Sequence, residues 1–132
     1  MKFIYMIFLA IWIAGCAGTG PGMDIPTGKN VVDLQEEEEE YAIIIDDPGF
    51  NTWMITNSRP IWYYSPQYYH QKNVLYVSDW NAKVSSFRGR GPFTDQINYD
   101  PTIDYGVEVD HQLYWYFKYI HRQYGRRYTF PG

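Results

Sequence analysis

The sequence of 132 residues contains one cysteine, three histidines and no apolar run as long as the roughly 20 residues of a transmembrane helix. A lone cysteine cannot form an internal disulfide. No two histidines are three or four residues apart, and no second cysteine is present, so the spacing disfavours a zinc site. Serine-nucleophile and phosphate-loop motifs are also absent. We therefore expect no cofactor and no metal site.

The N-terminus carries the clearest motif. A positive start at Lys2 is followed by an apolar run to Ile13 and then by Ala14, Gly15 and Cys16. This order of charged, apolar and small residues is that of a secretory signal. It resembles the bacterial lipoprotein signal, in which the cysteine is acylated and becomes the first residue of the mature protein. The resemblance implies a signal peptide over residues 1–15 and a lipid on Cys16, whose several acyl chains would hold the protein stably at a membrane.

Ala17 bears on which membrane this would be. By resemblance to the common sorting rule, an aspartate after the cysteine retains a lipoprotein in the inner membrane, and Ala17 is not one. We therefore expect a protein of the cell envelope that is anchored in the outer membrane and faces the periplasm.

Residues 16–40 have the composition of a flexible acidic tether. Glycine and proline interrupt the segment, and residues 36–40 are five consecutive glutamates, which repel one another. Cation capture and docking on a basic partner are the alternatives for this run. From Pro48 onward, six acidic residues face nine basic ones, and four of the basic ones lie near the C-terminus. That grouping fits a helix end better than a nucleic-acid surface, so we expect no nucleic-acid partner.

Residues 41–132 are expected to form one small α+β domain, with about three helices on a short sheet of two or three strands. Twenty-two of the 26 aromatic residues lie there, enough to fill a small core. The three isoleucines in 41–46 favour a strand covered on both faces. Residues 96–99 alternate and predict a second strand that pairs with it, and residues 128–130 a short edge strand.

Cap-plus-proline pairs predict the starts of two helices. Asp47 precedes Pro48, and this helix should stop at Ser58; Ser65 precedes Pro66, and this one should run to about residue 86. Asn73 falls on the apolar stripe of the second helix. A third helix is expected over residues 106–124, with Asp104 as its N-cap.

Several motifs of the body resemble one family. They are the segments 46–50, 64–65, 80–81, 97–106, 108–109 and 113–117, together with Trp53. The chain looks like a member of a domain-of-unknown-function family of small bacteroidete lipoproteins. The resemblance implies a lipid anchor, a compact aromatic-rich domain and no assigned activity, so it supplies no catalytic residues.

Carboxylates are densest at Asp100, Asp104, Glu108 and Asp110. The spacing begins like a calcium loop, but the glycine is one place late and His111 occupies the place of the bidentate glutamate. A hydrolase that uses Asp100, Asp104 and Glu108 is one hypothesis. The structural alternative is that Asp100 starts a turn, Asp104 caps the last helix and Glu108 complements its dipole. We expect the three histidines to be surface or edge residues.

The high content of aromatic residues is the remaining feature of the sequence that bears on function. Trp62, Tyr63 and Tyr64 are consecutive and cannot all point inward, and Trp115 and Tyr119 lie off the main stripe of the last helix. They predict either an exposed surface for an envelope protein or a glycan, or a helix packed on two sides. The expected function is a non-enzymatic envelope interaction or structural protein. A glycan or peptidoglycan binder and, with less support, the carboxylate hydrolase are the alternatives.

Overall fold

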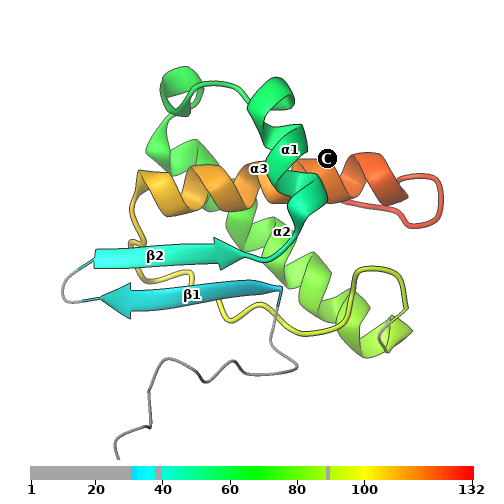
Figure 1. Ribbon diagram of the computed structural model, residues 1–132. Helices are drawn as coiled ribbons and strands as arrows, with labels where there is room; N and C mark the ends of the chain where they lie inside the picture. Colours follow the sequence, from blue (N-terminus) through cyan, green and yellow to red (C-terminus); the bar gives the residue numbers. More distant parts are fainter. Residues whose placement is uncertain (1–30, 38–39, 89) are drawn as a thin grey trace, which may run out of the picture.

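The computed structural model describes residues 31–37, 40–88 and 90–132. They form two antiparallel strands followed by three α-helices, with one short 3-10 turn between the first two helices. In Figure 1 the last helix, α3 (Val107–Tyr124), runs through the middle of the molecule, the strands lie below it, and α2 (Pro66–Phe87) crosses it diagonally. The expected α+β class, with three helices and a short sheet, is confirmed.

The strands form a hairpin that begins earlier than expected. β1 (Val32–Glu37) pairs with β2 (Glu40–Ile45) in a register that places Val32 opposite Ile45. Both of these side chains are buried in the core, so residues 32–37 belong to the folded domain. The expectation of a tether up to residue 40 is therefore wrong for this segment. Glu36 of β1 pairs with Tyr41, and Glu40 of β2 pairs with Glu37, at one end of the hairpin. The side chains of Glu36 and Glu40 are exposed there, so water solvates their carboxylates.

The isoleucine run covers one face of the sheet, not two. Ile45 is buried and Ile43 packs against the core, whereas Ile44 is 50% exposed. This alternation is that of a two-stranded hairpin with one face on the core. The expectation that both faces are covered is not met.

Two of the expected strands are absent from the described residues. The 96–99 segment is held by a side chain of α2: Asn81 Nδ2 donates to Ile97 O over 3.0 Å, and Ile97 N donates to Asn81 Oδ1 over 2.8 Å. The backbone is satisfied in this way and needs no neighbouring strand. Residues 128–130 are held by aromatic packing in place of strand pairing, since the Tyr128 ring lies against the rings of Phe87 and Phe93.

The first two helices start where the cap-plus-proline pairs predict. α1 (Pro48–Asn57) is capped by Asp47, whose Oδ1 accepts from Phe50 N over 3.1 Å. Ser65 Oγ accepts from Tyr68 N over 3.1 Å at the start of α2. The 3-10 turn η3 (Ile61–Tyr63) joins these two helices.

α3 begins at a glycine cap. Its N-cap is Gly106, with φ 95° and ψ 151°, and no side chain caps the helix. Only glycine adopts this conformation readily, which explains the residue. Asp104 Oδ1 accepts from Gly106 N over 3.0 Å and so closes a turn before the helix. The prediction of Asp104 as the N-cap is therefore wrong by two residues.

The core is built around α3, which packs against α1, α2, β2 and η3. Leu113, Tyr116, Phe117 and Ile120 on α3 are almost fully buried. Phe50 of α1 meets the Tyr116 ring edge-on at 5.2 Å between centroids. Among the residues described, no helix has both the length and the hydrophobicity to span a bilayer.

Candidate functional site

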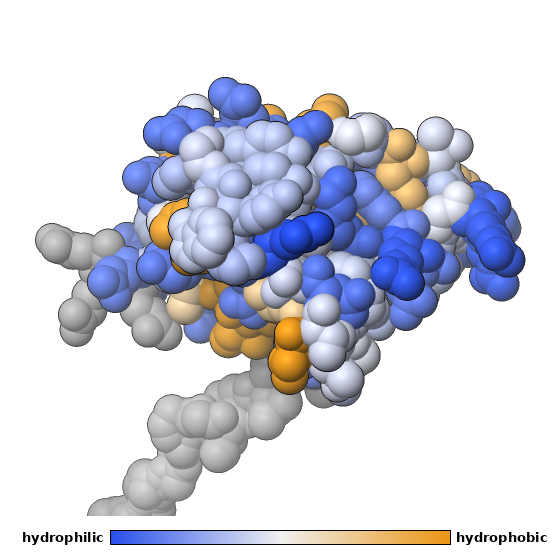
Figure 2. Space-filling model, turned by 90° about the horizontal axis from the view of Figure 1, so that it is seen from above, coloured by the Kyte–Doolittle hydropathy of each residue, from blue (hydrophilic) through white to orange (hydrophobic). Residues whose placement is uncertain are grey.

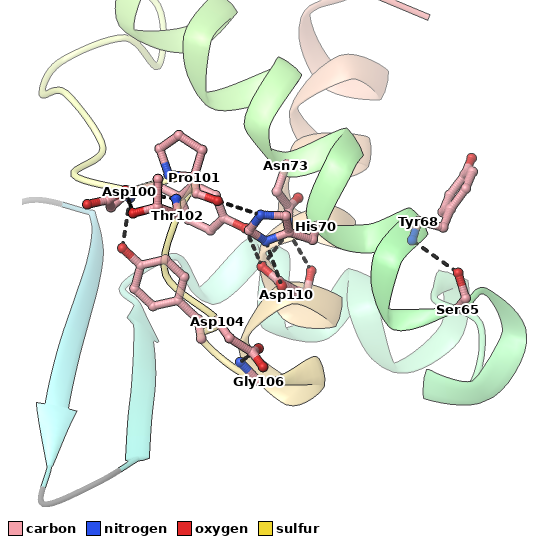
Figure 3. Close-up of polar contacts among 12 residues, drawn as sticks. Ser65, Tyr68, His70, Asn73, Asp100, Pro101, Thr102, Asp104, Gly106 and Asp110 are labelled. Atoms are coloured by element: carbon pink, nitrogen blue, oxygen red, sulfur yellow. Dashed lines mark hydrogen bonds and ion pairs between the residues drawn. The ribbon is translucent and has the colours of Figure 1, made fainter.

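A pocket of about 310 Å³ lies where the first turns of α2 and α3 meet the loop between residues 99 and 105. Gln67, His70 and Gln71 line it from α2, and Asp110 lines it from α3. The loop contributes residues 101–104. Figure 3 shows these three segments converging on His70 and Asp110.

Asp110 is the buried charged group of this pocket, with 3% of its surface exposed. Its Oδ1 accepts from the Tyr99 hydroxyl over 2.7 Å and from Asn73 Nδ2 over 3.1 Å. Asn73 Nδ2 also donates to the backbone oxygen of Asp110 over 2.9 Å. The other carboxylate oxygen, Oδ2, lies 3.5 Å from His70 Nδ1, and the described residues offer it no closer polar partner.

His70 is bound on both sides of its ring. Its Nε2 lies 2.9 Å from the Pro101 carbonyl oxygen, which can only accept, so this nitrogen donates. Its Nδ1 lies 2.7 Å from the Tyr99 hydroxyl. Burial, and then the hydrogen bond to Asp110, raises the pKa of Tyr99, which keeps the phenol protonated. Tyr99 donates its single proton to Asp110, and both ring nitrogens of His70 are engaged.

Local turns position the loop that carries Tyr99. Asp100 Oδ1 accepts from the backbone nitrogen of Thr102 over 2.8 Å and from its hydroxyl over 2.7 Å. These bonds lower the pKa of Asp100, the hydroxyl contributing most. The Tyr105 hydroxyl accepts from Asp100 N over 2.8 Å. The turn presents the Pro101 carbonyl to His70.

The carboxylates proposed from the sequence are divided among different environments. Asp100 initiates a turn, as expected, and lines neither of the hollows beside the loop. Asp104 lines the pocket with Asp110, and it also lines a neighbouring hollow with Glu108. No group of three histidine, cysteine or acidic residues within the described ranges is placed to hold a metal ion. Asp100, Asp104 and Glu108 therefore do not share one pocket.

The aromatic residues proposed from the sequence also separate into two sets. Trp62 is 77% exposed and Tyr63 is 45% exposed, whereas Tyr64 stacks on Tyr68 at 4.1 Å between ring centroids. The Arg59 guanidinium lies 4.9 Å from the centre of the Tyr63 ring. Trp62 and Tyr63 therefore form an exposed aromatic turn.

Trp115 and Tyr119 lie in the interior. Each is 9% exposed, and α1 covers both, because Trp53 lies 6.4 Å from the Trp115 ring and 5.6 Å from the Tyr119 ring. Of the two alternatives for these residues, the structure has the helix packed on two sides. They are not part of an exposed surface.

The three histidines are partly buried and lie apart from one another along the fold. His111 Nε2 lies 2.7 Å from the Arg59 carbonyl oxygen. His121 stacks on Phe130 at 4.3 Å between centroids. Cys16 and the expected signal peptide over residues 1–15 lie outside the described residues.

Sequence reasoning missed the cluster of His70, Asn73, Tyr99 and Asp110. One signal was available, since Asn73 falls on the apolar stripe of α2, and a buried amide needs hydrogen-bond partners. Asp110 lies three residues before Leu113 and seven before Phe117, on the buried side of α3. The sequence gives no spacing that joins these residues to Tyr99.

A model of a family of unknown function, DUF6146, matches residues 3–129. The chain belongs to this family. The match confirms the expectation of a domain-of-unknown-function family, and it covers the described fold of this DUF6146 chain almost completely. No curated protein and no solved structure matches the chain.

Proposed function

We propose that this DUF6146 chain is a membrane-anchored lipoprotein of the cell envelope, of the kind found in bacteroidetes, and acts as a non-enzymatic interaction protein. The residue order up to Cys16 supports the anchor. The exposed aromatic turn at Trp62 and Tyr63 is the proposed contact surface. We place the anchor in the outer membrane, with the domain facing the periplasm.

The observation that carries the interaction role is the exposure of Trp62 on a well-fixed turn. The Pro60 carbonyl accepts from Tyr63 N over 2.9 Å, and the Arg59 carbonyl contacts His111 of α3. A large ring is therefore held in water by a backbone that is already ordered, which limits the entropy lost on binding. Tryptophan and tyrosine anchors contribute much of the energy of protein interfaces.

The surroundings of the turn agree with a localised contact. Figure 2 looks down on the end of the molecule that carries α1, where hydrophilic and intermediate residues alternate with small, separate hydrophobic areas. Ile55 on α1 is 83% exposed. Such a surface favours a few aromatic anchors over a broad aliphatic interface.

The chemistry of the pocket supports binding over catalysis. Both nitrogens of His70 are engaged, so neither is free to take a proton from a substrate. The three acids of the hydrolase hypothesis do not line one hollow together, since Asp104 and Glu108 share the neighbouring hollow and Asp100 lines neither.

The interaction role is tested by crosslinking the native lipoprotein in cells and comparing two variants. Trp62→Ala should remove crosslinked partners and leave the unfolding free energy nearly unchanged. Ile55→Ala is the matched control, since it truncates a side chain of similar exposure outside the turn. Identical crosslinks in wild type and Trp62→Ala would reject the turn as the contact surface.

A glycan is the second candidate for the same aromatic turn, because two adjacent exposed rings can also stack on a sugar. Sedimentation with purified peptidoglycan separates the two: co-sedimentation that Trp62→Ala abolishes would favour the glycan. The anchor is tested independently. Metabolic labelling with a fatty-acid probe should mark the wild type and not Cys16→Ser, and equal labelling would reject the lipoprotein assignment.

A further inference from the structure

We infer that the pocket between α2 and α3 binds a small hydroxylated ligand that carries an ammonium group, with Asp110 Oδ2 as its main acceptor. This inference concerns a different surface from the aromatic turn and does not depend on the function proposed above. It rests on the charge of the pocket lining, on the free capacity of Asp110 and on the polar groups around it.

The first argument is the charge of the lining. Asp104 and Asp110 line the pocket, and neither lysine nor arginine does. His70 is the group that can carry positive charge there. With a protonated His70 the lining has a net charge of −1, and with a neutral ring it has −2. The pocket is therefore negative in either state, which favours a cation over an anion.

The second argument is the hydrogen-bonding capacity of Asp110. Oδ1 is engaged by Tyr99 and Asn73, whereas Oδ2 has only the 3.5 Å contact with His70 in the described part of the chain. A buried ionised carboxylate gains most from short bonds to donors, and a carboxylate oxygen can accept more than one. The fold thus holds Oδ1 by internal bonds and leaves Oδ2, on a residue that lines the pocket, with room for a donor.

The helix starts around the pocket do not reverse this preference. α2 and α3 both begin here, and helix N-termini attract anions. However, Ser65 already caps α2, and the first turn of α3 carries Glu108 and Asp110. Each helix terminus acts as about half a charge, so the two together offset about one carboxylate, whereas Asp104, Asp110 and Glu108 supply three. The acids therefore outweigh the dipoles.

The remaining lining groups suit hydroxyls. Gln67, Gln71 and Thr102 are exposed at the rim and offer both donors and acceptors, and Ile103 and Val107 add an apolar wall. A compact ring or chain with several hydroxyl groups matches this mixture better than a purely aliphatic amine. An amino sugar is a simple member of the class.

The test is a titration of the full-length chain in detergent with glucosamine and glucose, followed by NMR amide shifts at mildly acidic pH. The two sugars differ only in an ammonium group for a hydroxyl. Glucosamine should bind at least about tenfold more tightly, as expected for a charge-assisted hydrogen bond. The shifts should centre on residues 67–71 and 101–110. Equal affinity for both sugars, binding of neither, or tighter binding of the anion glucuronate would each overturn the inference.

Variants of single acidic residues test whether the preference for glucosamine arises in this pocket. Asp110→Asn removes the charge at the anchor and should abolish the preference for glucosamine. Because Asp110 is buried, Asp104→Asn provides a second measurement on an exposed residue, whose amide oxygen can still accept from Gly106 N. It should reduce the preference while leaving the fold intact. Glu36→Gln makes the same charge change on the hairpin and should have no effect. A preference that survives in both Asp104→Asn and Asp110→Asn would reject the site.

Discussion

Tyr99 Oη lies 2.7 Å from Asp110 Oδ1, so a buried phenol from the loop before α3 holds a buried carboxylate of α3. The same hydroxyl lies 2.7 Å from His70 Nδ1 of α2. One side chain thus ties the loop to two helices. Since the carboxylate would be costly to bury without donors, the position of Asp110 depends on this contact.

The first prediction concerns this hydroxyl. Tyr99→Phe removes one oxygen and leaves Asp110 Oδ1 with Asn73 as its donor, so it should lower the unfolding free energy by about 1–3 kcal/mol. Chemical denaturation measures this. Tyr63→Phe is the matched control: that side chain is 45% exposed, and its hydroxyl makes no hydrogen bond within the described residues. The control should change stability by less than about 0.5 kcal/mol. Equal stability of Tyr99→Phe and wild type would show that the contact does not support the fold.

The second prediction distinguishes the two aspartates that precede helices. Asp47 caps α1 through Phe50 N, so Asp47→Ala should cost about 0.5–2 kcal/mol, and Asp47→Ser should recover most of it. Asp104 closes an exposed turn before Gly106, so Asp104→Ala should lower the unfolding free energy by less than Asp47→Ala does. Denaturation of these three variants decides the matter, and a larger loss in Asp104→Ala would contradict the assigned caps.

The parts of the fold that the sequence predicts are those set by neighbouring residues. Asp47-Pro48 and Ser65-Pro66 specify helix starts within four residues, and both appear as expected. Strand pairing depends on partners elsewhere, and there the prediction failed. Residues 96–99 alternate like a strand, but Asn81 on α2 satisfies their backbone. Val32 and Leu34 looked like part of a tether because the glutamates after them dominate the local composition.

The candidate site could be predicted from the sequence only in part, for the same reason. Asn73 on an apolar stripe signals a buried hydrogen bond, yet its partner Asp110 is 37 residues away. Tyr99 and His70 are 29 residues apart, and no helical or strand period joins them. The exposure of Trp62 and the burial of Trp115 likewise depend on where α1 lies, because Trp53 covers the latter.

The third prediction follows from that difference between the two tryptophans. Trp115→Ala should lower the unfolding free energy by about 3–5 kcal/mol, as truncations of large core residues do. Trp62→Ala should stay within about 0.5 kcal/mol of wild type, because its ring is in water. Denaturant titration of both variants tests the pair. Similar losses in both would mean that the exposed turn is covered in solution.

The fourth prediction concerns His121 at the end of α3. Its ring stacks on Phe130 and meets Tyr76 edge-on at 4.9 Å. Burial, followed by the charges of Lys118 and Lys83, lowers the pKa of His121 from 6.5 to about 4. Between these two values the unfolded chain binds a proton that the folded chain does not. The stability is therefore complete above about pH 6.5 and falls as the pH falls towards 4.

The control for His121 is a residue that cannot titrate. In His121→Gln this part of the pH dependence should vanish, so the stability of the wild type relative to the variant should decrease from pH 7 to pH 4. The comparison removes the contribution of the carboxylates and of the other histidines to the pH dependence of stability, because both proteins share these groups. His111→Gln, which changes a histidine bound to the Arg59 carbonyl, should keep the wild-type decrease, because it retains His121. If the difference between wild type and His121→Gln were constant over this range, or grew as the pH fell, the ring would be accepting a proton in the folded state. The packing of His121 between Phe130 and Tyr76 would then have to open in solution.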